Sequence, residues 1–200
     1  MSEKSDIKSV DKINSETKSE SKTASKTLQT SLRIFWGQVR KVDRSIHDPD
    51  KLRFLNRIPF FENLKKGQME LVAKIVYVRE YLENEYLFEY GQPGAALFII
   101  QSGEVSVEMP ADNGEVTQLA VLGKSTFIGE LALLDEAKRS ASARALEPTK
   151  VYALFRKDLD ALAEEHPEVT SHIYKSLAVI VGNRLKATNE LIKYSKKVAA

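Results

Sequence analysis

The segment from Phe127 to Ala141 combines the chemical groups needed to hold a sugar phosphate. Gly129 has no Cβ, so the backbone there can approach a ligand closely. Arg139 carries a fork of charged donors that matches phosphate oxygens. Glu130 only accepts hydrogen bonds when it is ionised, and it therefore suits a ribose hydroxyl rather than the phosphate. Residues 130–134 can form a short helix whose free N–H groups attract an anion. This spacing predicts a site for the sugar and phosphate of a nucleotide.

The spacing of these residues alone also allows a simpler interpretation of the segment. In it, the segment is a hairpin loop in which Arg139 only forms an ion pair with Glu130 or Glu136. Short glycine motifs often occur without a function. The chain on either side of the segment must therefore separate the two interpretations.

The residues around this segment form a block of short β-rich stretches separated by turn signals, which is typical of a β-sandwich or barrel. Glycines at 91, 94, 103 and 114 mark several of the turns. The apolar and polar residues of 104–109 alternate as in a half-buried strand. Strands are expected at 76–82, 86–90, 96–101, 104–109, 116–122, 140–146 and 150–155.

Composition divides the remaining chain into three parts. Residues 1–30 are almost wholly Ser, Lys, Thr, Glu and Asp, and such a tail is expected to be disordered because it has too little apolar area to bury. Residues 31–57 form an N-terminal helical segment, in which 50–57 is a short helix of its own. The β-rich domain is placed at 58–165, with helices near 69–75 and 157–165, and one long helix at 166–200 that Pro167 starts.

The helix predicted between Leu32 and Ile46 is amphipathic and basic. Such a helix can lie on an anionic membrane or dock on its own domain or on a second copy. We expect this helix to dock on its own domain or on a second copy, and we expect no membrane association.

The Gly129–Ala141 segment resembles the phosphate-binding cassette of the cyclic nucleotide-binding domain family, which includes the catabolite activator protein and the regulatory subunits of cAMP-dependent protein kinase. Lys138 stands where that family often has proline, and Ser125 where it often has glycine. The resemblance runs from about Pro59 to Asn189. The residues that match the family pattern, in order and at its spacing, are Gly129, Glu130, Leu131, Ala132, Leu133, Arg139, Ser140 and Ala141.

The resemblance implies an α+β, mainly β fold: an eight-stranded antiparallel β-roll, jelly-roll-like, with N-terminal helices and a long C-terminal helix. It also implies that Arg139 binds the cyclic phosphate and that Glu130 accepts from the ribose 2′-OH. The long helix would cover the base. The remaining ligand contacts that it implies are Gly129, the backbone N–H groups of Leu131 and Ala132, Ser140, Ala141, and the base contacts Thr188 and Asn189. Leu119, Val121 and Leu122 on the preceding strand are candidates for the apolar wall of the pocket, and only some of them can face inward.

Composition excludes several classes of function. There is no cysteine, so disulfides and thiolate sites are absent from the sequence. His47, His166 and His172 all lie outside the β block, so no metal centre, cofactor or enzymatic activity is expected. No apolar run approaches a membrane span, and a cytoplasmic protein is expected. The net charge of +2 does not indicate nucleic acid, and the chain ends at Ala200 without room for a helix-turn-helix domain, so no direct DNA binding is expected.

These observations predict a regulatory protein that senses cAMP, with cGMP as the alternative, and that signals to an unknown protein partner by a conformational change. The long helix predicts a homodimer, since its apolar stripe is larger than one domain edge can cover. Two other functions stay open: an interaction or scaffold module that has the same fold and does not respond to nucleotide, and a sensor of a cyclic dinucleotide.

Overall fold

The structure is a computed structural model that describes residues 49–111 and 115–198, with side chains described up to Tyr194. The predicted tail at 1–30, the helix predicted at 32–46 and residues 112–114 lie outside the described residues. Both strands that flank residues 112–114 are described, and they pair from Val105 opposite Leu122 to Pro110 opposite Val116.

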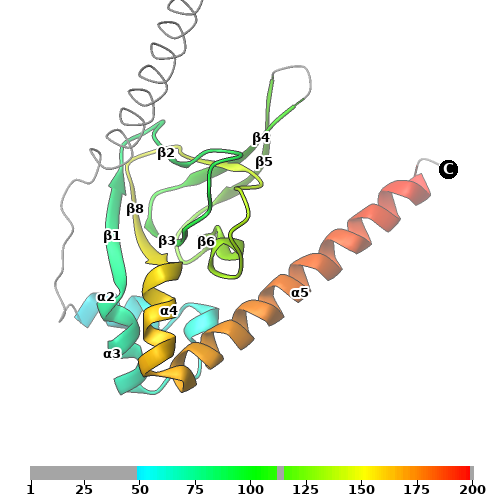
Figure 1. The fold of residues 1–200 in the computed structure, drawn as a ribbon. Helices are drawn as coiled ribbons and strands as arrows, with labels where there is room; N and C mark the ends of the chain where they lie inside the picture. The colour runs from blue at the N-terminus through cyan, green and yellow to red at the C-terminus, as the bar shows by residue number, and fades with distance from the viewer. Residues whose placement is uncertain (1–48, 112–114, 199–200) are drawn as a thin grey trace, which may run out of the picture. The chain divides into compact units, whose positions relative to one another are not determined.

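Eight antiparallel strands form two four-stranded sheets, as predicted (Figure 1). One sheet has the order β1-β8-β3-β6 and the other β2-β7-β4-β5. The strand that the sequence did not indicate is β6, whose two residues are too few for an alternating pattern. The bounds are β1 Val76–Tyr81, β2 Tyr86–Phe88, β3 Ala96–Ser102, β4 Val105–Pro110, β5 Val116–Leu122, β6 Phe127–Ile128, β7 Ser142–Ala145 and β8 Thr149–Phe155.

Helices precede and follow the strands in the chain, and a short 3₁₀ helix interrupts them. Pro167 is the first residue of α5, where a proline is tolerated because the first helical N–H has no partner within the helix. None of the described helices has the length and apolar character needed to cross a bilayer. The bounds are α2 Pro49–Leu55, η1 Pro59–Phe61, α3 Lys66–Lys74, η2 Glu130–Leu133, α4 Arg156–Glu165 and α5 Pro167–Val198.

Strand β3 is buried on both faces, which explains its unbroken apolar run. Leu97 and Ile99 point into a core that also holds Phe60, the α4 residue Leu159 and α5 residues such as Ile173. Residues on the other face of β3 pack between the two sheets, against side chains from β2, β4, β7 and β8. The first core fixes the start of α5 against the β-roll, and the second holds the two sheets together.

One turn brings the backbone close to the cassette that follows β6, and the turn before β6 has a residue in the left-handed conformation. A Cβ on Gly94 would lie 3.0 Å from both the Ala132 Cβ and the Ala137 carbonyl oxygen, so the β2–β3 turn packs directly under the cassette. Ser125 has a φ of 67°, in the left-handed region that glycine adopts most easily. This conformation explains why a glycine is frequent at that position in the family that the sequence resembles.

Candidate functional site

The cassette begins where β6 ends in a left-handed turn at Gly129. This residue has a φ of 81°, and a Cβ placed on it would lie 2.4 Å from Nη1 of Arg139. A side chain at position 129 would therefore be strained by the backbone and would collide with Arg139. The 3₁₀ helix η2 follows at once and extends over most of the short helix that the sequence predicts at 130–134.

Arg139 turns inward, and only 8% of it is exposed. Its Nη2 donates to the Ala96 carbonyl at 2.7 Å, and its Nη1 donates to the Gly129 carbonyl at 3.3 Å. The guanidinium carbon lies 4.1 Å from the centre of the Phe88 ring, in the range of a cation–π contact. Two main-chain carbonyls and the Phe88 ring, with the Phe98 ring at 5.8 Å, thus set the position of this side chain.

The charge of Arg139 is only partly compensated by these contacts. Burial lowers the pKa of Arg139 to about 10, although the nearby charge of Glu130 acts in the opposite direction. The buried Nε of Arg139 has no hydrogen-bond partner among the described residues. A cation with free donor capacity in a partly desolvated site is suited to an anion, because buried charges are normally paired.

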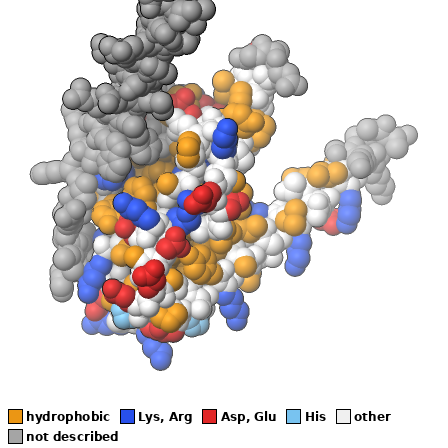
Figure 2. Space-filling view, in the orientation of Figure 1, with side chains coloured by type: hydrophobic (Ala, Val, Ile, Leu, Met, Phe, Trp, Pro, Cys, Tyr) orange, Lys and Arg blue, Asp and Glu red, His pale blue; other side chains and the backbone are white. Residues whose placement is uncertain are grey.

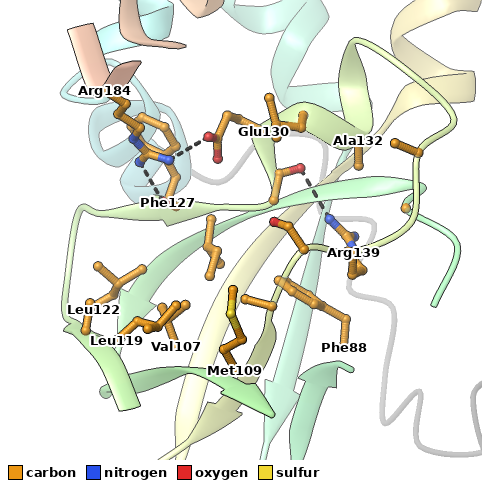
Figure 3. A pocket seen from close by; sticks show the side chains of 18 of the residues that line it. Phe88, Val107, Met109, Leu119, Leu122, Phe127, Glu130, Ala132, Arg139 and Arg184 are labelled. Carbon is orange, nitrogen blue, oxygen red and sulfur yellow. Dashed lines mark hydrogen bonds and ion pairs between the residues drawn. The ribbon is translucent and has the colours of Figure 1, made fainter. Parts of the chain in front are cut away.

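Glu130 is also buried, at 7% exposed, and its ion-pair partner comes from α5. Nη1 of Arg184 lies 2.6 Å from Oε1 of Glu130, and the Arg184 guanidinium lies 5.1 Å from the centre of the Phe127 ring. Figure 3 shows this pair at one end of the site, with Arg139 at the other. Arg184 was not among the ligand-site residues predicted from the sequence. The signal that could have identified it was its place four residues before Thr188, on the same face of a helix.

These residues line a cavity of about 730 Å³ (Figure 3). Residues of β4 and β5 form an apolar wall, which includes Val107, Met109, Leu119 and Leu122. One face of α5 supplies a further side, with the spacing expected of a single helix face. The α5 residues at the cavity are Arg184, Ala187, Thr188 and Leu191.

A cavity with apolar walls, one buried cation and one buried carboxylate agrees with the comparisons with known proteins. Residues 78–166 match the family model described as the cyclic nucleotide-binding domain. The chain is also 36% identical over 128 residues to the "Cyclic AMP receptor protein" of Thermus thermophilus, which covers 64% of this chain and 57% of that protein.

The chain belongs to the cyclic nucleotide-binding domain family.

Solved structures of this domain agree with the fold. The crystal structure of the Thermus thermophilus catabolite activator protein matches with a TM-score of 0.62 and 33% identity, over 69% of this chain and 63% of that one. The N-terminal domain of a transcriptional regulator from Streptomyces coelicolor matches with a TM-score of 0.60 and 31% identity, over 70% of this chain and 94% of that one. The chain spans less than three fifths of the length of the curated relatives that head the comparison, with 57%, 31% and 58% covered.

Within the domain, most of the residues predicted from the sequence line the cavity. The Ala132 N–H group, predicted as a phosphate donor, donates within η2 to the Gly129 carbonyl at 3.2 Å, so a ligand would have to share or replace that bond. The predicted residues at the cavity are Gly129, Glu130, Leu131, Ala132, Arg139, Ser140, Ala141, Leu119, Leu122 and Thr188.

Val121 and Asn189 are not among the residues that line this cavity. Val121 pairs with Ser106, so it faces the opposite side of the sheet from its neighbours Ala120 and Leu122, which do line the cavity. Leu119 reaches the cavity because the register shifts between Val107 and Glu108 and leaves it without a direct partner. Of the three candidates for the pocket wall, Leu119 and Leu122 line this cavity and Val121 does not. Asn189 follows Thr188 by about 100° around the helix axis and so leaves the cavity face.

The structure does not agree with the simpler interpretation, in which Arg139 only forms an ion pair with Glu130 or Glu136. The ion-pair partner of Glu130 is Arg184, and that of Glu136 is Arg156. Arg139 instead donates to main-chain carbonyls at the edge of the cavity. The domain thus presents a cation and a carboxylate that separate elements hold in place.

Proposed function

We propose that this chain is a sensor of a cyclic nucleotide, cAMP in the first place, that binds it in the cavity between the cassette, β4–β5 and α5. The observation that carries the proposal is that the buried Arg139, whose Nε has no hydrogen-bond partner in the part of the chain that the structure describes, lines the cavity together with the buried Glu130. The cyclic phosphate takes the Arg139 guanidinium, and the ribose 2′-OH donates to Glu130. A carboxylate has about four acceptor positions, so Glu130 can serve both the ribose and Arg184.

The base of the nucleotide lies between the apolar wall of β4–β5 and the face of α5. Leu119, Leu122 and Met109 offer apolar area to the base, and Leu191 does so from the helix. Thr188 is the hydroxyl on that helix face, and its hydroxyl donates to the Arg184 carbonyl at 3.0 Å. The names of two relatives, a cyclic AMP receptor protein and a cAMP-activated regulator, favour cAMP over cGMP.

The output of such a sensor is a change of conformation rather than a reaction. A ligand shifts an equilibrium only through its different affinities for two states. Here Glu130 belongs both to the ligand site and to the contact with α5, so a bound ribose changes the surroundings of Arg184 directly. We infer a non-enzymatic regulatory role, with a protein partner that senses the position of α5.

We further propose that α5 pairs with α5 of a second copy. Its residues Ala178, Val181, Leu185, Thr188 and Ile192 follow the three-and-four spacing of a coiled-coil seam. Leu185 is 60% exposed and Ile192 is 47% exposed within one chain. Figure 2 shows hydrophobic side chains along α5, interrupted by charged ones. A second helix would bury these side chains.

Thermal unfolding with and without ligand tests the ligand class. Binding at about 100 times the dissociation constant adds about 2.7 kcal/mol of stability, which raises the Tm of a domain this size by roughly 5–10 °C. The panel contains cAMP, cGMP and cyclic dinucleotides. A shift with cAMP supports the proposal, a shift only with a cyclic dinucleotide replaces the ligand, and no shift with any of them supports the non-responsive scaffold.

Calorimetry on two variants tests the site. Arg139→Ala and Glu130→Ala are each expected to weaken cAMP binding by at least about tenfold, since removing one partner of a buried charge pair costs about 2–5 kcal/mol. The larger loss of affinity is expected for Arg139→Ala. Arg79→Ala is the matched control, because Arg79 also lies over an aromatic ring, that of Phe155 at 6.0 Å, but does not line the cavity. Wild-type affinity in the Arg139 or Glu130 variant would remove the site assignment.

A further inference from the structure

Arg156, the first residue of α4, connects three parts of the structure near the cassette. Its backbone N–H donates to the Ala95 carbonyl at 2.9 Å, in the turn before β3. Its Nη1 donates to the Ala132 carbonyl at 3.3 Å and to the Asp135 carbonyl. These two carbonyls flank the end of η2, where a helix leaves its last acceptors without partners. Arg156 therefore caps the far end of the cassette from a different element.

The carbonyl contacts, rather than the ion pair of Arg156, are its stronger tie to the cassette. Nη2 of Arg156 also lies 3.3 Å from Oε1 of Glu136, but the Glu136 side chain is 91% exposed. Exposed ion pairs contribute little, because water screens them. The Arg156 side chain itself is only 23% exposed, and its bond to the Ala132 carbonyl is partly buried. A charged donor at a helix C-terminus also complements the helix dipole.

The loop between η2 and Arg139 has its other anchor on the β2–β3 turn. Gly94 N–H donates to the Ala137 carbonyl at 3.2 Å, and Arg139 N–H donates to the Gln92 carbonyl at 2.8 Å. Lys138 stands between these two bonds, opposite Pro93. The Arg139 end of the loop is thus hydrogen-bonded to the β2–β3 turn, and the η2 end to Arg156. Leu133 of η2 also packs in the buried core. Without Arg156, the loop would keep only the first of these two sets of hydrogen bonds.

The same residue brings the cassette into contact with the helices that follow β8. Arg156 begins α4, and α4 is joined to α5 by the hydrogen bond from the Tyr174 hydroxyl to Oδ1 of Asp160, at 3.1 Å. Leu159 of α4 and Ile173 of α5 lie in one buried core. This connection is separate from the direct pair between Glu130 and Arg184.

We propose that Arg156 is a positioning residue for the ligand site: it holds the cassette in the binding-competent conformation and ties that conformation to α4. The inference rests on the proposed function, since it concerns the same cavity. Arg156 does not line the cavity, and it acts through the carbonyls of Ala132 and Asp135. Its removal lowers the fraction of molecules whose cassette is preorganised.

The expected signature follows from this role. If the competent fraction falls to about a tenth, the apparent dissociation constant rises about tenfold, and the loss appears in the association rate rather than in the dissociation rate. Arg156→Ala is therefore expected to bind cAMP, or cGMP if wild type binds that nucleotide, about tenfold more weakly with a nearly unchanged dissociation rate. Arg156→Lys keeps a charged donor for one carbonyl and is expected to recover part of the affinity. A residue that only stabilises the fold would not produce this pattern.

The experiment measures binding kinetics and amide hydrogen exchange on the full chain. Without nucleotide, Arg156→Ala is expected to speed exchange at Leu134, Asp135 and Ala137, whose N–H groups form bonds within the loop, while the amides of β3 and β8 keep their protection. Lys157→Ala, an exposed neighbour on the same helix, is the control and should change neither readout.

The outcomes separate the two proposals. If wild type binds neither cAMP nor cGMP, the proposed function fails. Independently of ligand binding, unchanged amide hydrogen exchange of the cassette in Arg156→Ala would overturn the positioning role. If wild type binds and Arg156→Ala binds equally well, the positioning role is wrong although the sensor function stands. Weaker binding by Arg156→Ala that comes only from faster dissociation also overturns the positioning role, because it would indicate that Arg156 contacts the bound ligand.

Discussion

Arg139 illustrates at the residue scale how a binding site is prepared before its ligand arrives. The folded chain buries a guanidinium, gives it two neutral carbonyls and an aromatic face, and leaves its Nε without a partner among the described residues. Burial lowers the pKa of Arg139 to about 10, which still leaves the side chain charged at neutral pH. An anion in the cavity would offset the free-energy cost of this desolvation. Because the carbonyls and the Phe88 ring already fix the fork, little side-chain entropy is lost on binding.

The planar fork of Arg139, and not only its charge, is expected to matter. Arg139→Lys keeps the positive charge, but an ammonium cannot donate to both the Ala96 and Gly129 carbonyls and lie over the Phe88 ring as the guanidinium does. Calorimetry with cAMP is expected to show binding at least about tenfold weaker, since a hydrogen bond to a charged group contributes about 1.5–3 kcal/mol. Arg79→Lys provides the control outside the cavity. Equal affinity of Arg139→Lys and wild type would show that charge alone is sufficient.

At the scale of elements, the cassette was predictable because its signals are local, and the partners of its side chains were not. Gly129, Glu130 and Arg139 lie within one short segment with a recognisable spacing. Arg184 is 54 residues from Glu130, and nothing in the helix periodicity says which turn of α5 meets the cassette. Strand β6 was missed because two residues show no alternation. The sequence left open which of Leu119, Val121 and Leu122 face the cavity, because strand alternation has two phases and only the observed register selects one.

The contact between α5 and the cassette is expected to depend on Arg184. Arg184→Ala leaves the buried carboxylate of Glu130 without its ion-pair partner, so Glu130 is held less firmly for the ribose. We expect cAMP to bind about threefold to tenfold more weakly, less than for a fully buried pair because half of the Arg184 side chain is exposed. Hydrogen exchange of α5 near residue 184 is expected to rise in the same variant.

Lys186→Ala is the control for this experiment, since Lys186 is an exposed cation two residues away that does not line the cavity. Tighter binding of cAMP by Arg184→Ala would reverse the interpretation. Arg184 would then compete with the ligand for Glu130 instead of orienting the carboxylate.

At the scale of the whole molecule, the proposed ligand site and the proposed dimer seam share one helix. Thr188 lies in the sequence of seam positions and also lines the cavity. If both proposals hold, cAMP binding and dimerisation are linked, and the linkage is reciprocal: whatever factor the dimer adds to the affinity for cAMP, cAMP adds to the dimer. Turn spacing and periodicity indicated a β-sandwich or barrel, and the family resemblance indicated the β-roll with its long helix. The link between ligand and dimer depends instead on how α5 is rotated, which the packing of its first turns on the core and the Glu130–Arg184 pair set.

Sedimentation equilibrium on the full chain tests the seam. Leu185→Glu places a charge among the seam positions and is expected to shift the protein from dimer to monomer at micromolar concentration, because a buried charge without a partner costs several kcal/mol. Val179→Glu is the matched control: Val179 is 56% exposed on the same helix, but it lies about 120° around the axis from Leu185. Wild type that is monomeric with and without cAMP would remove the dimer. An equal loss of dimer in both variants would move the interface to another face of α5.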